Sequence, residues 1–222
     1  MSQAQQTIEA ENGKQIQRPA ERSRRAILDA AIVAFSTYGF GGARVDKIAE
    51  SAKVNKAMLY HYFGSKEDLY LAALKEIYID IRRAEAELDL DMDDPEAAIA
   101  GLVAFTFRYY IDHPAFIRII NTENLYGAMH LKGASDMPTL NAPILEKVAA
   151  ILKTGVAQKV FRAGIDPLDL YISISSLGFT YVANRHTLEA VFGRNLLAPD
   201  QIEARLAAMT DMVLRYLVPD PA

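Results

Sequence analysis

Residues 45–63, VDKIAESAKVNKAMLYHYF, constrain the fold of this chain more than any other stretch. Asn55 divides it and suits a helix N-cap, because its side-chain oxygen accepts from a backbone N–H that a helix leaves unpaired. Two sets of apolar residues on either side recur at helical spacing: Val45, Ile48, Ala49 and Ala52, then Leu59, Tyr62 and Phe63. The stretch therefore predicts two short helices, over about 44–52 and 56–63, joined by a tight turn.

The face of the second short helix that points away from its apolar side carries a cation, a small residue and two aromatic hydrogen-bonding groups: Lys56, Ala57, Tyr60 and His61. Lysine binds phosphate, a small residue lets the backbone approach closely, and tyrosine and histidine can reach base edges. This face indicates a helix that enters the major groove of duplex DNA. Ordinary packing between helices is the alternative for Tyr60 and His61, and Met58 either contacts a thymine methyl group or fills space.

An amphipathic helix precedes the pair, with apolar residues at i, i+3, i+4 and i+7: Ile27, Ala30, Ala31, Ala34, Phe35 and Tyr38. Gly39 predicts its end, because glycine adopts the left-handed conformation without a Cβ clash. Residues 1–20 show no regular period and predict a disordered arm. Where the arm joins the helix, four arginines either reach phosphates or a minor groove or form a solvated cluster: Arg18, Arg22, Arg24 and Arg25.

The net charge of −4 is unevenly distributed. Residues 1–75 hold 11 lysines and arginines against 8 aspartates and glutamates, whereas residues 76–222 hold 13 against 20. A basic first part and an acidic remainder suit a DNA-binding head on a body that avoids phosphate. An imbalance of this size also arises by chance.

The remainder predicts further helices, and no stretch alternates with period two for long enough to form a strand. Ser65 and Asp68 predict a capping box at the start of the fourth helix, and prolines open most later ones. Residues 126–141 have no clear pattern and predict a loop or weak helix. The chain is therefore expected to be all-α, with about nine helices. The later ones are expected over about 65–88, 95–112, 114–125, 142–163, 167–192 and 199–218.

Several classes of function are excluded by what the chain lacks. The sequence has no cysteine, so it forms no disulfide or thiolate metal site and suits the cytoplasm. Its apolar runs are too short to span a membrane, and its polar N-terminus does not resemble a secretory signal. The four histidines stand singly, without an H-E-x-x-H spacing, and no G-x-S-x-G elbow is present. We expect no metal, no cofactor and no enzymatic activity.

Together, the helix ending at Gly39 and the following VDKIAESAKVNKAMLYHYFGSKEDL resemble the TetR family of bacterial transcriptional regulators. The resemblance is specific over residues 22–75 and rests on length and helix pattern beyond them. It implies a disordered arm (1–20), a helix-turn-helix DNA-binding domain (21–67) and a ligand-binding and dimerisation domain (68–222). Carried over to this chain, the DNA-binding residues are Arg44, Asn55, Lys56, Ala57, Tyr60, His61 and Lys66.

Three positions depart from the family pattern. Lys53 stands where the turn usually has glycine, so it is either left-handed or the turn differs. Ala43 and Arg44 supply no capping hydroxyl to the helix that follows. Asp46 would repel a phosphate unless it points away or accepts from a cytosine amino group.

The resemblance also implies a homodimer through residues 167–192 and 199–218, bound to a palindromic DNA operator, and a small-molecule effector that releases it. A monomer that buries both segments internally is the alternative. Aromatic and polar residues are the candidate effector site: Phe105, Tyr109, Phe116, Asn121, Asn124, His130 and Phe179. The aromatic residues would otherwise be plain core, and the carboxamides would cap a helix end. The expected function is a ligand-released repressor; the alternative is a helical metabolite-binding or scaffold protein without specific DNA binding.

Overall fold

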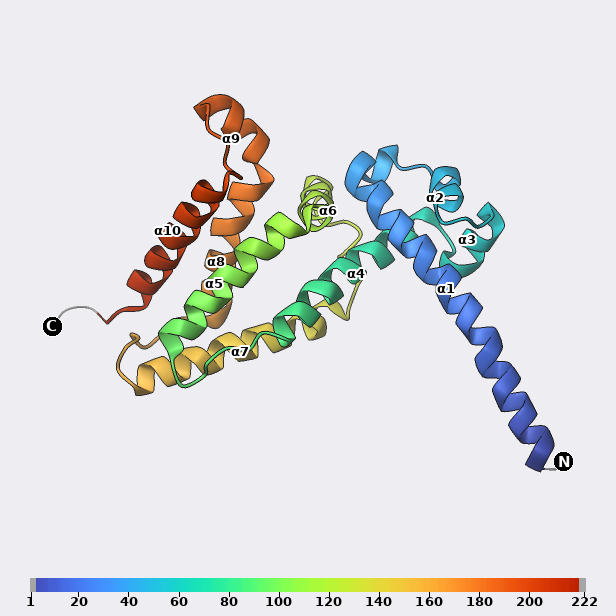
Figure 1. The fold of residues 1–222 in the computed structure, drawn as a ribbon, viewed down its shortest axis with the longest axis horizontal. Helices are drawn as coiled ribbons and strands as arrows, with labels where there is room; N and C mark the ends of the chain where they lie inside the picture. Colours follow the sequence, from blue (N-terminus) through green and yellow to red (C-terminus); the bar gives the residue numbers. More distant parts are fainter. Residues whose placement is uncertain (1–2, 220–222) are drawn as a thin grey trace. The chain divides into compact units, whose positions relative to one another are not determined.

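A computed structural model describes residues 3–219, with side chains from residue 19 onward, and within that range the chain is all-helical with no strand (Figure 1). The chain forms two compact units, Met1–Glu76 with Arg118–Gly133 and Ile77–Ile117 with Ala134–Ala222. The ten helices are α1 (Gln3–Gly42), α2 (Val45–Ser51), α3 (Lys56–Phe63), α4 (Lys66–Ala86), α5 (Pro95–Asp112), α6 (Pro114–Leu125), α7 (Met137–Ala157), α8 (Pro167–Ala183), α9 (Arg185–Phe192) and α10 (Pro199–Leu217).

The all-α prediction is confirmed, and two predicted helices have different bounds. The helix expected over 142–163 is α7, which begins at Met137 because Pro138, not Pro143, occupies its first turn. It ends early because Lys159 is left-handed, with φ +61°, and turns the chain. The helix expected over 167–192 is two helices, separated at Asn184, where φ −99° and ψ 8° leave the helical range.

The first unit packs α1, α2, α3 and the start of α4 around a small core. Ile27, Phe35, Leu59 and Tyr70 are completely buried there. Gly39 interrupts α1 with φ +66°, so the predicted helix end at this glycine is confirmed. The backbone of residues 3–20 belongs to α1, so it is helical where the sequence predicted a disordered arm. The side chains of residues 3–18 lie outside the description, and the domain boundaries stay a prediction.

The second unit is a helical bundle in which α5 packs against α7, α8 and α10 (Figure 1). Leu102, Phe107, Ile174 and Met209 are completely buried between these helices, and burying such a side chain contributes about 1.5–3 kcal/mol. Gly178 brings α8 close to α5, since a Cβ at this position would lie 3.3 Å from the Tyr110 ring. Over the described part of the chain, every helix is too short or too polar to cross a membrane.

Candidate functional site

The turn between α2 and α3 is a Schellman motif with lysine at the position that usually holds glycine. Val54 N–H donates to the Ala49 carbonyl at 3.0 Å, and Lys53 N–H donates to the Glu50 carbonyl at 3.1 Å. Lys53 has φ +57°. Of the two possibilities that the sequence left, the structure shows the left-handed one, at a cost of about 1 kcal/mol.

Asn55 sets the start of α3. Its Oδ1 accepts from the Met58 backbone N–H at 2.7 Å, so the predicted N-cap is confirmed. The cap uses one lone pair of this oxygen, and the amide nitrogen of Asn55 is the group able to donate to a phosphate.

The two faces of α3 separate as the sequence predicted, except that Tyr62 on the apolar face is only half-buried. Leu59 and Phe63 are buried in the first unit, whereas four residues of the opposite face are exposed: Lys56, Ala57, Tyr60 and His61. The Lys56 Nζ lies 5.7 Å from the centre of the Tyr60 ring, a cation–π pair one helical turn apart. This face thus presents to solvent a cation, a small residue that leaves the backbone accessible, and two aromatic groups that can form hydrogen bonds. Groups of this kind bind phosphates and the edges of bases.

Arg44 is already paired in the free protein. Its Nη2 lies 2.8 Å from Asp46 Oδ2 and its Nε lies 3.1 Å from Asp46 Oδ1, and both side chains are largely solvent-exposed. The hydrogen bond from Arg44 is the main cause that lowers the pKa of Asp46, so the carboxylate stays ionised. In the free protein, the guanidinium next to the start of α2 thus has a carboxylate beside it.

Lys66 lies at the start of α4, directly after the cap. Ser65 Oγ accepts from the Asp68 backbone N–H at 3.0 Å, which confirms the N-cap half of the predicted capping box. The other half differs, because Asp68 Oδ2 accepts from the Ser65 hydroxyl at 2.6 Å, whereas the Ser65 backbone N–H donates to the Phe63 carbonyl. The Lys66 Nζ lies 4.9 Å from the centre of the Phe40 ring. Lys66 thus has a defined position within the first unit, and its ammonium group has the chemistry to bind a phosphate.

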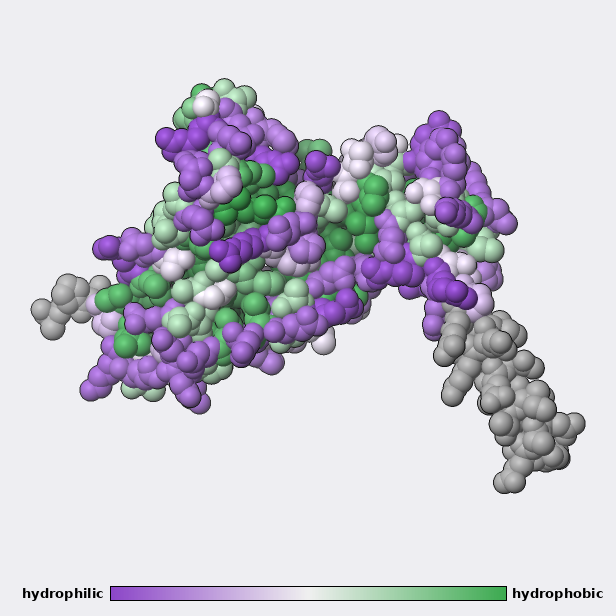
Figure 2. Space-filling view, in the orientation of Figure 1, coloured by the Kyte–Doolittle hydropathy of each residue, from purple (hydrophilic) through white to green (hydrophobic). Residues whose placement is uncertain are grey.

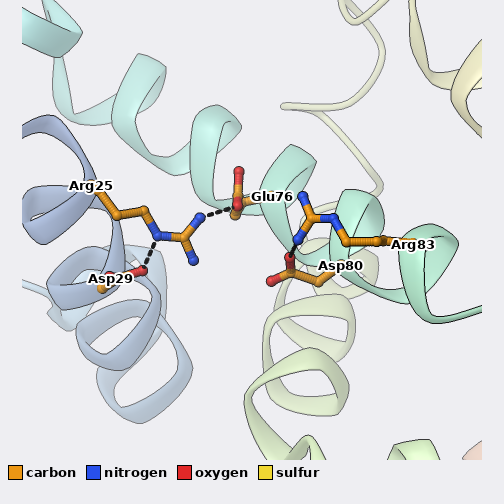
Figure 3. Close-up of polar contacts among 5 residues, drawn as sticks. All are labelled: Arg25, Asp29, Glu76, Asp80 and Arg83. Atoms are coloured by element: carbon orange, nitrogen blue, oxygen red, sulfur yellow. Dashed lines mark hydrogen bonds and ion pairs between the residues drawn. The ribbon is translucent and has the colours of Figure 1, made fainter. Parts of the chain in front are cut away.

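Two of the four arginines that the sequence analysis singled out at the predicted start of the first helix contact side chains of the first unit, Arg24 and Arg25. Arg25 pairs with Asp29 at 2.8 Å and with Glu76 of α4 (Figure 3). The Arg24 guanidinium lies 5.1 Å from the centre of the Phe63 ring. Arg18 lies outside the described side chains. Arg25 therefore links α1 to α4 through its ion pair with Glu76.

Residues 27–73 match a family model described as bacterial regulatory proteins, tetR family, and residues 95–213 match one described as a tetracyclin repressor-like C-terminal domain. The chain belongs to the TetR family. It is a DNA-binding transcriptional regulator of the helix-turn-helix type, and members of this family are regulators rather than enzymes.

Two TetR-family relatives resemble the chain along most of its length. The HTH-type transcriptional repressor NicS of Pseudomonas putida is 39% identical over 198 residues, 89% of this chain and 93% of the relative. The HTH-type transcriptional regulator RutR of Escherichia coli K12 is 36% identical over 179 residues, 81% of this chain and 82% of the relative. Among solved structures, transcriptional regulator SCO4942 from Streptomyces coelicolor has a TM-score of 0.64 at 26% identity, with 90% and 99% of the two chains covered.

The seven candidate effector residues fall into two groups. The four aromatic ones form a chain of ring contacts in the second unit, completed by Tyr110. Asn121, Asn124 and His130 belong to the first unit, where both asparagines are exposed. The contacts run between Phe105 and Tyr109 (5.6 Å), Tyr109 and Phe116 (5.9 Å), Phe116 and Tyr110 (5.6 Å), and Tyr110 and Phe179 (5.9 Å).

His130 has a partner of its own in the first unit. Its Nδ1 lies 2.8 Å from Glu123 Oε2, and Glu123 Oε1 accepts from the backbone N–H groups of His130 and Leu131. The ring of His130 also packs 4.7 Å from the rings of Phe40 and Tyr70. This arrangement fixes the chain after α6, and it accounts for Glu123 as a structural carboxylate.

Phe105 and Tyr109 line an open groove of about 540 Å³ between α4 and α5. A smaller pocket, between α4 and α7, lies beside a buried ionic cluster that the sequence analysis did not find: Arg82, Glu85, Lys147 and Tyr171. Arg82 and Glu85 are spaced three residues apart on an otherwise apolar helix face, which is the signal in the sequence. Their partners are 62 to 89 residues away in the chain, and nothing local indicates them.

Proposed function

We propose that this TetR-family chain is a repressor that acts in the cytoplasm, binds a palindromic operator as a homodimer and is released by a small molecule bound in its second unit. The exposed polar face of α3 carries the proposal, because its residues have no packing role in the first unit. Two relatives support repression rather than activation of transcription: NicS of Pseudomonas putida and SCO4008 of Streptomyces coelicolor are both named repressors.

The dimer is supported by an apolar surface on α8 and α10. Leu168 and Ile172 on α8, and Met212 and Tyr216 on α10, are each between 43% and 50% exposed. Figure 2 shows hydrophobic residues at the surface over these helices. Small exposed residues nearby permit close helix approach: Ser173, Ser176, Ala207 and Ala208. A two-fold dimer would present its two α3 helices to DNA about 34 Å apart.

The dimer is tested with Ile172→Glu, which places a carboxylate in the proposed interface. We expect sedimentation velocity to show a dimer for the unchanged chain and a folded monomer for this variant. Met92→Glu is the control, because Met92 is also exposed, at 37%, but lies in the connection before α5. A dimer that survives Ile172→Glu would place the interface elsewhere.

Release by a ligand requires that ligand binding and DNA binding share a structural element. Helix α4 is such an element, since it carries Lys66 in the first unit and Arg82 and Glu85 in the second. A ligand shifts the DNA-binding equilibrium only by its difference in affinity between two arrangements of the protein, commonly about 1–3 kcal/mol.

DNA binding is tested by selecting duplexes from a random-sequence library with the purified chain. We expect enrichment of a palindrome whose half-sites lie about one helical turn apart. The affinity for the selected duplex should fall steeply with added salt, because phosphate contacts release counterions. A metabolite-binding or scaffold protein would enrich no sequence and would show flat or absent binding.

A further inference from the structure

The pocket between α4 and α7 has the chemistry of an anion site. Its volume is about 180 Å³, and it is partly open to solvent. Three apolar residues and three charged ones line it: Ala86, Pro143 and Ile144, then Arg82, Glu85 and Lys147.

The charged side chains at its inner end are buried but incompletely paired. The Arg82 side chain is 9% exposed and that of Glu85 is 2% exposed. Arg82 Nη2 donates to the Tyr171 hydroxyl at 2.5 Å, and this hydroxyl donates to Glu85 Oε1 at 3.0 Å. Arg82 Nη1 lies 2.8 Å from Glu85 Oε2, yet Arg82 Nε, Arg82 Nη1 and Glu85 Oε2 have no directed hydrogen bond among the residues from 19 to 219. Buried polar groups are normally satisfied, and Nη1 and Oε2 at least form an ion pair with each other. Over these residues Arg82 Nε has neither, so this donor points to a missing acceptor.

Cations outnumber anions around the pocket. Lys147 Nζ donates to the backbone carbonyl of Glu85 at 2.7 Å, which holds its ammonium group at the lining. Arg82 and Lys147 face one carboxylate, so the pocket keeps an excess positive charge. A guanidinium fork matches the geometry of a carboxylate, whereas a cationic ligand would be repelled.

The space limits the size of the ligand. A protein cavity of about 150 Å³ accommodates one benzene molecule, and this pocket is slightly larger at about 180 Å³. Its apolar walls suit a hydrocarbon body rather than a sugar or nucleotide.

We propose that Arg82 and Lys147 bind the carboxylate of a small organic acid with an apolar body about the size of one ring. Its role as the effector rests on the proposed ligand-released repressor, whereas the binding itself can be measured without DNA.

Glu85 gives the site a dependence on pH. Burial raises the pKa of Glu85 to about 7, against the lowering effect of Arg82, Tyr171 and Lys147. Tyr109 and Tyr110 of α5 also interact electrostatically with this group. A ligand carboxylate beside Glu85 favours its protonated form, so binding should take up a proton and strengthen from about pH 8 to pH 6.

The test is isothermal titration calorimetry of the full chain with benzoate, cyclohexanecarboxylate and isovalerate, compared with neutral benzamide and cationic benzylamine. We expect at least one acid to bind about tenfold or more tightly than benzamide, and Lys147→Gln to weaken it about tenfold. Glutamine at 147 removes the charge and keeps a side-chain donor, one bond closer to the backbone than the lysine ammonium group.

Two further variants separate recognition from a structural role. Glu85→Gln removes the repelling carboxylate and should bind the acid as tightly or more tightly, without the pH dependence. Arg108→Gln is the control, because Arg108 lines the other groove and is 56% exposed. Equal binding of benzamide, tighter binding of benzylamine, equal losses in Lys147→Gln and Arg108→Gln, or no binding of any acid at millimolar concentration would overturn the proposal.

A parallel titration against the selected duplex distinguishes the two proposals. If the duplex binds but no acid does, the anion site is wrong and the repressor stands. If an acid binds in the Lys147-dependent manner but leaves duplex affinity unchanged, the anion site stands and release by this ligand is wrong.

Discussion

Asp46→Asn should strengthen DNA binding. In the free protein both oxygens of Asp46 engage Arg44, at 2.8 and 3.1 Å. Both side chains are exposed, so water screens the pair and its separation is readily compensated by phosphate. Asparagine keeps the shape of Asp46 and removes the charge, which leaves the Arg44 guanidinium free to neutralise one more phosphate.

The size of the effect follows from counterion release. Each neutralised phosphate adds about 0.9 to the slope of log affinity against log salt. Over a fourfold change in salt, from about 50 to 200 mM, one extra contact therefore changes affinity by about 3.5-fold more than in the unchanged chain. Because phosphate contacts carry no sequence information, the gain should be the same for the selected duplex and for a random one.

Fluorescence anisotropy of labelled duplexes at several salt concentrations measures this slope. Glu50→Gln is the matched control, since Glu50 is an exposed carboxylate of the same helix that pairs with Lys47 at 2.7 Å. Asp46→Asn combined with Arg44→Gln should lose most of the gain, as two coupled residues do in a double-mutant cycle. Weaker binding by Asp46→Asn, confined to one base pair of the operator, would refute this reasoning and show that Asp46 reads a cytosine amino group.

Three other substitutions test the turn before α3, the exposed face of α3 and the buried carboxyl of α4. Lys53→Gly should raise the free energy of unfolding by about 1 kcal/mol relative to Lys53→Ala in urea denaturation, because only glycine relieves the left-handed strain of this turn. Lys56→Ala should weaken binding to every duplex and reduce the salt slope by about 0.9, with an unchanged melting temperature. The Glu85 carboxyl binds its proton more tightly in the folded chain, because burial raises its pKa from the ordinary value of 4.5 to about 7. Its contribution to the free energy of unfolding is therefore fully present below about pH 4.5 and is lost as pH rises through 7. Glu85→Gln should remove this decline, which amounts to about 3 kcal/mol, when unfolding is followed across this pH range.

Local signals in the sequence determined much of the fold. Asp94 and Asp166 cap the helices that open with Pro95 and Pro167, and both contacts involve residues two or three positions away. Pro143 was misleading because a proline marks a helix start only in its first turn, and Pro138 occupies that turn in α7. Asn184 gave no warning of the break between α8 and α9, since asparagine also occurs inside helices.

The predicted DNA face needed only one helix and its cap, so its arrangement could be derived from spacing. The prediction of the effector site had no such basis, because aromatic residues at helical spacing look alike in a core and in a pocket. The structure assembles Phe105, Tyr109, Phe116 and Phe179 through ring contacts, but it places His130 in a structural pair with Glu123. Which of these residues touch a ligand stays a prediction.

Helix α4 places charged side chains inside the second unit, although the helical bundle there does not need them for its stability. Ile77 and Ile81 show that its inner face can be apolar, yet Arg82, the next residue, and Glu85, one turn after Ile81, are also buried. Replacing a buried ion pair with apolar residues is often neutral or stabilising, so stability alone is a weak reason to keep this one. Binding of a ligand that completes the hydrogen bonds of Arg82 is a reason for this ion pair to be present. The pair lies on α4, the helix that begins with Lys66.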